Sequence, residues 1–60
     1  MRFEDMKENS VYRHIPNNHY YIVVEIDDFE TTIKSLRDPE IVLSLFNNAP
    51  YFRDSEEVNI

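Results

Sequence analysis

The sequence predicts a small α+β domain in which an antiparallel hairpin packs on two short helices. The run 20–26, Tyr-Tyr-Ile-Val-Val-Glu-Ile, is almost entirely β-branched or aromatic, which is typical of a strand. Asp27 precedes Glu30 by three residues, as in a capping box at the start of a helix over 28–37. Asp38-Pro39-Glu40 combines a capping acid, a first-turn proline and a first-turn acid, which indicates a second helix.

The hairpin is expected to join strands at 11–15 and 20–26 through the turn 16–19. Glycine is absent from the chain, so positions with positive φ fall to asparagine, the next most tolerant residue. The pairs Asn17-Asn18 and Asn47-Asn48 are therefore the expected reversal points. Closing the first turn on Asn17-Asn18 pairs Ile15 with Tyr20.

Side chains of a strand alternate, so the hairpin has two faces. One is expected to form the core and holds Val11, Arg13, Ile15, Tyr20, Ile22, Val24 and Ile26. The other is expected to bind a partner, because tyrosine is enriched in interface hot spots; its candidate residues are Tyr12, His14, Tyr21 and Val23. The alternative is that residues 1–9 or Tyr51-Phe52 cover this second face as part of the core.

The second expected helix is apolar nearly all round, which is typical of a helix in a core or an interface. We expect it to mediate self-association, most simply as a dimer, through Ile41, Leu43, Leu45 and Phe46. A domain of this size without disulfides is marginal unless it oligomerises, which supports the same expectation.

The chain is expected to form one domain over residues 1–60, with 1–9 either a helical turn or an edge strand and 53–60 a frayed tail. Tyr51-Phe52 is expected to fold back onto the core. The full core prediction is Val11, Ile15, Tyr20, Ile22, Val24, Ile26, Phe29, Ile33, Leu36, Val42, Leu45 and Phe46.

The net charge of -6 disfavours direct binding to nucleic acid or to anionic membranes. Spaced acids can instead mimic a phosphate backbone, and the candidates are Glu25, Asp27, Asp28 and Glu30. The simpler explanation is local, because acids at helix starts satisfy free N–H groups and the helix dipole.

No catalytic or cofactor motif is present. Without glycine there is neither a P-loop nor a dinucleotide fingerprint. His14 and His19 have no third metal ligand at a recognised spacing, so we expect two solvated turn histidines and no metal or cofactor. We expect no enzyme activity, no signal peptide, no membrane span and a cytoplasmic location.

These observations favour a non-enzymatic protein-binding module that regulates or inhibits a partner by occupying its surface. In being small, acidic and free of cysteine, the chain resembles accessory inhibitors made by bacteriophages and mobile elements, a resemblance of composition alone. The alternatives are an acidic nucleic-acid mimic and a small self-assembling structural subunit. The leading hypothesis predicts that Val23→Lys or Tyr21→Ala weakens binding while the fold survives.

Overall fold

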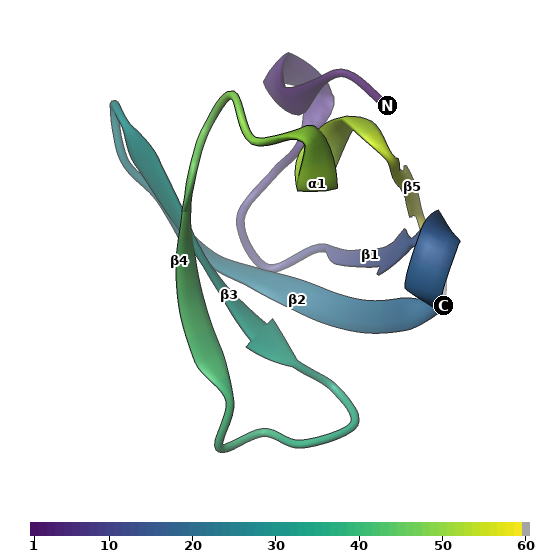
Figure 1. Cartoon of the computed structure of the whole chain (residues 1–60). Coiled ribbons are helices and arrows are strands. Elements are labelled where there is room, and N and C mark those ends of the chain that lie inside the picture. The colour runs from purple at the N-terminus through teal and green to yellow at the C-terminus, as the bar shows by residue number, and fades with distance from the viewer. Residues whose placement is uncertain (60) are drawn as a thin grey trace.

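The computed structural model describes residues 1–59, which form a five-stranded antiparallel sheet (Figure 1). The strands are β1 (Val11–His14), β2 (His19–Ile26), β3 (Glu30–Ser35), β4 (Val42–Phe46) and β5 (Ser55–Glu57). Their order is β4-β3-β2-β1-β5, so β1 to β4 form a meander and β5 returns to pair with β1. The helical elements are α1 (Pro50–Arg53) and two 3-10 turns, η1 (Phe3–Asp5) and η2 (Ile15–Asn17).

The predicted α+β class is therefore wrong, because no pair of helices packs on the sheet in the described part of the chain. The segments expected as helices form β3 and β4 instead. In β3, the buried Thr31, Ile33 and Ser35 alternate with the more exposed Thr32 and Lys34. This period of two belongs to a strand, and it competes with the helical spacing that the sequence also carries.

The acids that resembled helix caps lie in turns, and the side chain of one of them, Asp38, accepts a turn N–H. Asp27 N–H donates to the Glu30 carbonyl at 2.8 Å, closing the β2–β3 turn. Asp38 Oδ1 accepts the Glu40 N–H at 3.2 Å in the β3–β4 connection. An acid satisfies a free backbone N–H in a turn much as it does at a helix start, so local sequence does not separate the two.

The β1–β2 hairpin is confirmed as an element, but its register differs by two residues from the expected one. Arg13 pairs with Tyr20, where Ile15 had been expected. Ile15 lies in η2, and Asn18 closes the turn in the left-handed region with φ 56°. Because a shift of two residues preserves the alternation of side chains, the predicted division of the hairpin into two faces holds as far as Val24, where the β2–β3 pairing shifts.

The assignment of those faces to core and surface is reversed. The fully buried side chains include Tyr12, Tyr21 and Val23, which had been assigned to the binding face. Val24 and Tyr20, assigned to the core, are about half exposed. The rest of the core is Met6, Ile33 and Phe52, with Ile26 and Leu45 packed against it. Of the predicted core residues, only Ile33 is fully buried.

Polar partners make tyrosine suitable for this interior. Tyr21 Oη donates to Ser55 Oγ at 2.6 Å, and Ser55 Oγ donates to the Tyr51 carbonyl at 2.8 Å. Tyr12 Oη accepts the Lys7 N–H at 2.8 Å. Within residues 1–59, no buried side-chain nitrogen or oxygen lacks a hydrogen-bond partner. Each ring therefore contributes its apolar area to the core without leaving a buried hydroxyl unpaired.

A bulge lets β2 keep its last residue in the core. The β2–β3 pairing shifts between Val23 and Glu25, which places the extra residue at Val24. Val23 lies opposite Ile33 before the bulge, and Ile26 lies opposite the buried Thr31 after it. The inserted residue bends the strand and returns Ile26 to the buried face of the sheet, on which Val23 also lies.

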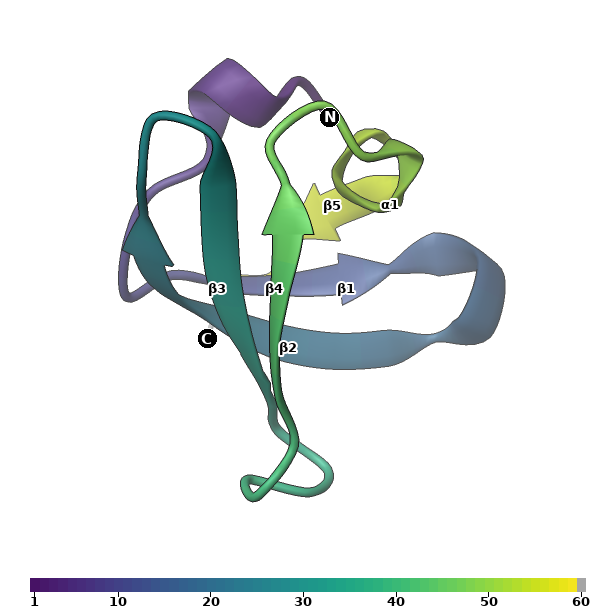
Figure 2. The ribbon, with the colours of Figure 1, turned by 60° about the vertical axis from the view of Figure 1, so that its left-hand side comes forward.

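Segments near the two ends of the described chain, η1 and α1, cover the buried face of the sheet (Figure 2). Phe52 of α1 is fully buried and lies 5.5 Å from Phe3 of η1 between ring centroids. The fold-back expected of Tyr51-Phe52 is thereby confirmed. The expected frayed tail is wrong for 55–57, which form β5 against β1; Ile60 lies outside the described residues.

Asn9 is a second left-handed residue, with φ 67°, and its N–H donates to the Val23 carbonyl at 2.7 Å. We expect Asn9→Ala to lower the free energy of unfolding by about 1 kcal/mol, because a Cβ without a polar side chain is strained in this region. Asn9→Gly is the matched control and should stay within a few tenths of a kcal/mol of the parent. Urea unfolding followed by circular dichroism measures both, and equal losses would contradict the strain at Asn9.

Candidate functional site

The face first expected to bind a partner is the interior of the protein. Tyr12, Tyr21 and Val23 are fully buried and make no surface on which a partner can dock in this fold. His14 is partly buried on the same side of the hairpin. The three buried side chains therefore have a structural role in the core.

The two histidines meet at Tyr51. The His14 ring stacks on Tyr51 with centroids 3.8 Å apart and planes 3° from parallel. His19 Nδ1 lies 2.5 Å from Tyr51 Oη, and its Nε2 lies 3.0 Å from Ser35 Oγ. Burial raises the pKa of the Tyr51 phenol, and the neighbouring Asn17 side chain opposes this rise. The histidines are thus packed and hydrogen-bonded, which corrects the expectation of solvated turn residues.

No group of three or more histidine, cysteine or acidic residues is placed to hold a metal ion anywhere in residues 1–59. The contacts of this cluster are instead those of a packed element. Ser35 Oγ also accepts the Asp38 N–H at 3.2 Å, which ties the β3–β4 connection to the cluster. The cluster therefore fastens β1, β2, β3 and α1 to one another.

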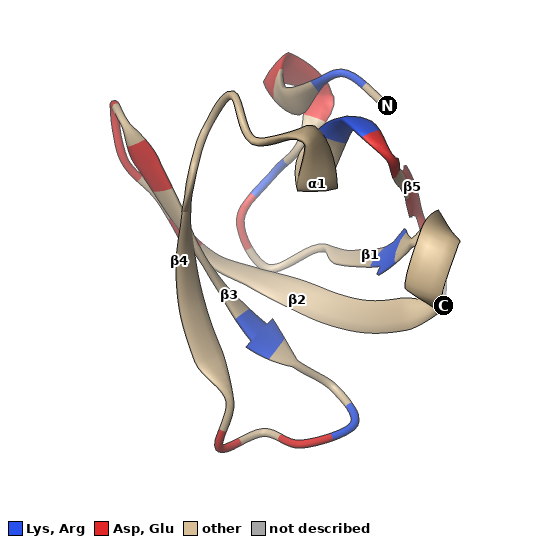
Figure 3. Cartoon of the chain, in the orientation of Figure 1, with Lys and Arg blue, Asp and Glu red and all other residues tan. Residues whose placement is uncertain are grey.

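The four acids of the mimic hypothesis gather at the β2–β3 turn (Figure 3). Glu25, Asp27, Asp28 and Glu30 are all exposed. The ion pairs among the described residues are Arg2–Glu4, Arg13–Glu56 and Arg53–Asp54, so none of the four is neutralised by a base. They concentrate negative charge at a single turn. A mimic of the phosphate backbone instead requires a row of negative charges at the spacing of phosphates.

The strongest surface feature is β4, an edge strand of the sheet. Its five residues, Val-Leu-Ser-Leu-Phe, carry no charge. Val42, Leu43 and Phe46 are exposed to 54%, 47% and 66%. Edge strands of natural proteins are normally protected by charges, prolines or bulges, because an open edge pairs with other chains. β4 has none of these protections.

The backbone of β4 offers free hydrogen-bonding groups. Ser35 N–H donates to the Ile41 carbonyl and Asn47 N–H donates to the Phe29 carbonyl, at 3.0 and 2.8 Å. In an antiparallel pair, every second residue hydrogen-bonds to the neighbouring strand. Because residues 41 and 47 bond to the chain of β3, the odd-numbered residues of 41–47 direct their N–H and C=O groups at β3. Even-numbered residues direct theirs at the open edge: Val42, Ser44 and Phe46. Of these groups, the Phe46 carbonyl is already used by the Ala49 N–H.

The apolar edge continues to the acidic β2–β3 turn. Phe29 is the most exposed large apolar residue of the described chain, and it shares an open hollow of about 370 Å³ with Asp28 and Phe46. The four residues of the predicted self-association helix all belong to this region. Leu43, Leu45 and Phe46 lie in β4 and Ile41 directly precedes it, so the correction concerns their secondary structure.

The apolar character of 41–46 is visible in the sequence, but the position of this segment at the edge of a sheet is not. The alternation in 31–35 is a strand signal, but it competes with a helical spacing over the same residues. No helix among residues 1–59 has the length and apolar character needed to cross a membrane. In comparisons with known proteins, no family model, curated protein or solved structure matches the chain.

Proposed function

We propose that this protein is a non-enzymatic protein-binding module that regulates or inhibits a partner by occupying its surface, and that β4 is the binding edge. The observation that carries the proposal is the combination, in one uncharged strand, of exposed apolar side chains and outward-facing backbone groups. A partner that adds an extended segment here gains main-chain hydrogen bonds for affinity and side-chain contacts for specificity. We also propose a cytoplasmic location, on the absence of cysteine alone.

A second copy of the chain is a specific candidate for the added strand. An antiparallel pair of β4 strands centred on Ser44 places Val42 opposite Phe46 of the other copy, so outward-facing residues meet outward-facing residues. Such a contact is isologous and closes as a dimer. It also keeps the two acidic β2–β3 turns at opposite ends of the paired strands, which limits repulsion between two chains of net charge -6.

We expect Val42→Lys to weaken binding at this edge by about 30-fold, the effect of losing a hot spot worth about 2 kcal/mol. A lysine on the edge strand disfavours strand addition, and the side chain is exposed enough for the fold to accept it. Val24→Lys is the matched control, because it makes the same substitution on β2, away from the edge, at 46% exposure compared with 54% for Val42. Ser44→Pro is a second test, since it removes an edge-facing N–H without removing a β3–β4 bond.

The measurement has two arms. Sedimentation equilibrium in 0.15 M salt compares self-association of the parent and the three variants. Capture from one nuclease-treated lysate compares the retained proteins, and the relevant partner is the one lost with Val42→Lys and Ser44→Pro and kept with Val24→Lys. If all variants behave as the parent in both arms, β4 is not the binding surface. Release of the partner by moderate salt or by competing DNA, with β4 variants unaffected, would favour the acidic mimic.

A further inference from the structure

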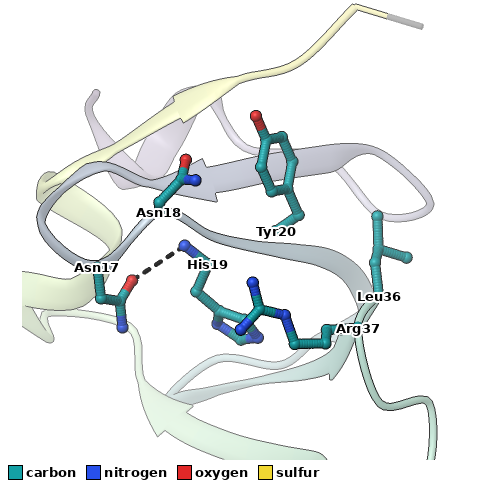
Figure 4. Close-up of a pocket in the computed structure, with 6 residues that line it drawn as sticks. All are labelled: Asn17, Asn18, His19, Tyr20, Leu36 and Arg37. Carbon is teal, nitrogen blue, oxygen red and sulfur yellow. Dashed lines mark hydrogen bonds between the residues drawn. The ribbon is translucent and has the colours of Figure 1, made fainter.

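A second site lies away from β4, in a pocket at the end of the β1–β2 hairpin (Figure 4). Its volume is about 480 Å³, and its lining residues are Asn17, Asn18, His19, Tyr20, Leu36 and Arg37. Asn17 ends η2, Asn18 follows it in the turn, and His19 and Tyr20 begin β2. Leu36 and Arg37 begin the β3–β4 connection. This volume is within the range of small-molecule sites.

The charge of the pocket is opposite to that of the protein. No acid lines it, although the chain has twelve acidic residues against six basic ones. Arg37 has no carboxylate within ion-pair distance among residues 1–59, whereas three other arginines each contact one. In a chain of net charge -6, an arginine that lines a pocket free of acids is an unneutralised cation with room beside it.

Two side chains of the pocket offer N–H donors. Asn18 uses its carbonyl oxygen to accept from Arg13 Nη1 at 3.1 Å, which leaves its amide nitrogen as a donor on the side of Tyr20 (Figure 4). The Arg37 guanidinium can only donate, and its planar fork matches two oxygens of a carboxylate or phosphate. The Tyr20 ring and Leu36 supply an apolar wall, since both side chains are about half exposed.

We propose that this pocket binds an oxyanion carried on a small apolar or aromatic body, with Arg37 as the anion-binding residue. A carboxylate or phosphate accepts from Arg37, while the body of the ligand contacts Tyr20 and Leu36. Two oxygens of one group satisfy the guanidinium fork, so the ligand is an acid of this kind and not a simple halide. The site rests on observations independent of β4.

The test is a titration followed by ¹⁵N chemical shifts, at constant 0.15 M sodium chloride, with phenyl phosphate, benzoate, inorganic phosphate and phenol as probes. We expect saturable shifts at Asn18, Leu36 and Arg37 with an aryl anion, at a dissociation constant on the order of 1 mM for so small a ligand. Stronger binding of phenyl phosphate identifies a phosphate site, and stronger binding of benzoate a carboxylate site; both support the proposal.

Arg37→Gln should weaken this binding at least tenfold, which corresponds to loss of about one charge-assisted hydrogen bond. Arg53→Gln is the matched control, because it removes the same charge from an exposed arginine outside the pocket and should leave binding unchanged. The spectrum of each variant reports whether it is folded. The proposal is overturned if no aryl anion gives saturable shifts, if both variants weaken binding equally, or if phenol binds as well as the anions.

Discussion

Replacing Tyr21 with alanine is expected to unfold the protein. Removing a buried aromatic side chain costs about 3 to 5 kcal/mol, and a domain of this length has a total stability of roughly 3 to 9 kcal/mol. Tyr21 is fully buried, its ring lies 6.0 Å from that of Tyr12 and 5.6 Å from that of Tyr51, and its hydroxyl is bonded to Ser55. The chain without it loses the centre of its core.

Tyr20→Ala is the control for this prediction. Tyr20 is the next residue of the same strand and lies on the outer face, about half exposed. We expect its removal to cost at most about 1 kcal/mol, as is usual for surface positions. Urea unfolding at neutral pH, followed by far-ultraviolet circular dichroism, compares the two. Equal stability of the variants, or a folded Tyr21→Ala protein that only binds more weakly, would restore the tyrosine face as a surface.

The protein is also expected to lose stability in alkali because of the same residue. Burial raises the pKa of Tyr21 to about 12, while the phenol of an unfolded chain titrates near 10. Between these values the unfolded chain has released a proton that the folded protein retains, so rising pH favours unfolding. The contribution of Tyr21 is fully present below about pH 10 and is lost progressively up to about pH 12. Two pKa units correspond to about 3 kcal/mol.

Tyr21→Phe separates this effect from general alkaline denaturation. At neutral pH the variant should be less stable than the parent by about 1 kcal/mol, because it lacks the hydrogen bond to Ser55. Above pH 10 its stability should fall less steeply, so the two curves converge and then cross. Tyr51, whose pKa is also raised by burial, acts in the same direction in both proteins. Parallel curves from pH 8 to pH 12 would show that Tyr21 is not the group responsible.

The candidate surfaces were only partly accessible from sequence. The apolar character of 41–46 and the acidity of 25–30 are visible in the residues themselves. The edge position of β4 is not, because it depends on which strands pair. The pocket beside Arg37 was missed altogether, since it joins η2 and β2 to the β3–β4 connection, and no local motif marks such a meeting.

The sequence by itself determined the strand character of 20–26, the alternation of the hairpin into two faces, the left-handed turn at Asn18 and the return of Phe52 to the core. These follow from local chemistry: β-branched and aromatic residues in a run, asparagine where glycine is absent, and an apolar residue after a turn. Only the tertiary structure decided that the tyrosine face is buried and that 30–35 and 42–46 are strands. Both hairpin faces are apolar enough for a core, so alternation alone leaves their assignment open. The choice depends on two residues that are distant in sequence. Phe52 covers the tyrosine face, and Ser55 accepts a hydrogen bond from Tyr21 on that face. Capping and turn signals are likewise equivalent locally. In the folded protein 30–35 is a strand that pairs with β2 and places the buried Ile33 opposite the buried Val23.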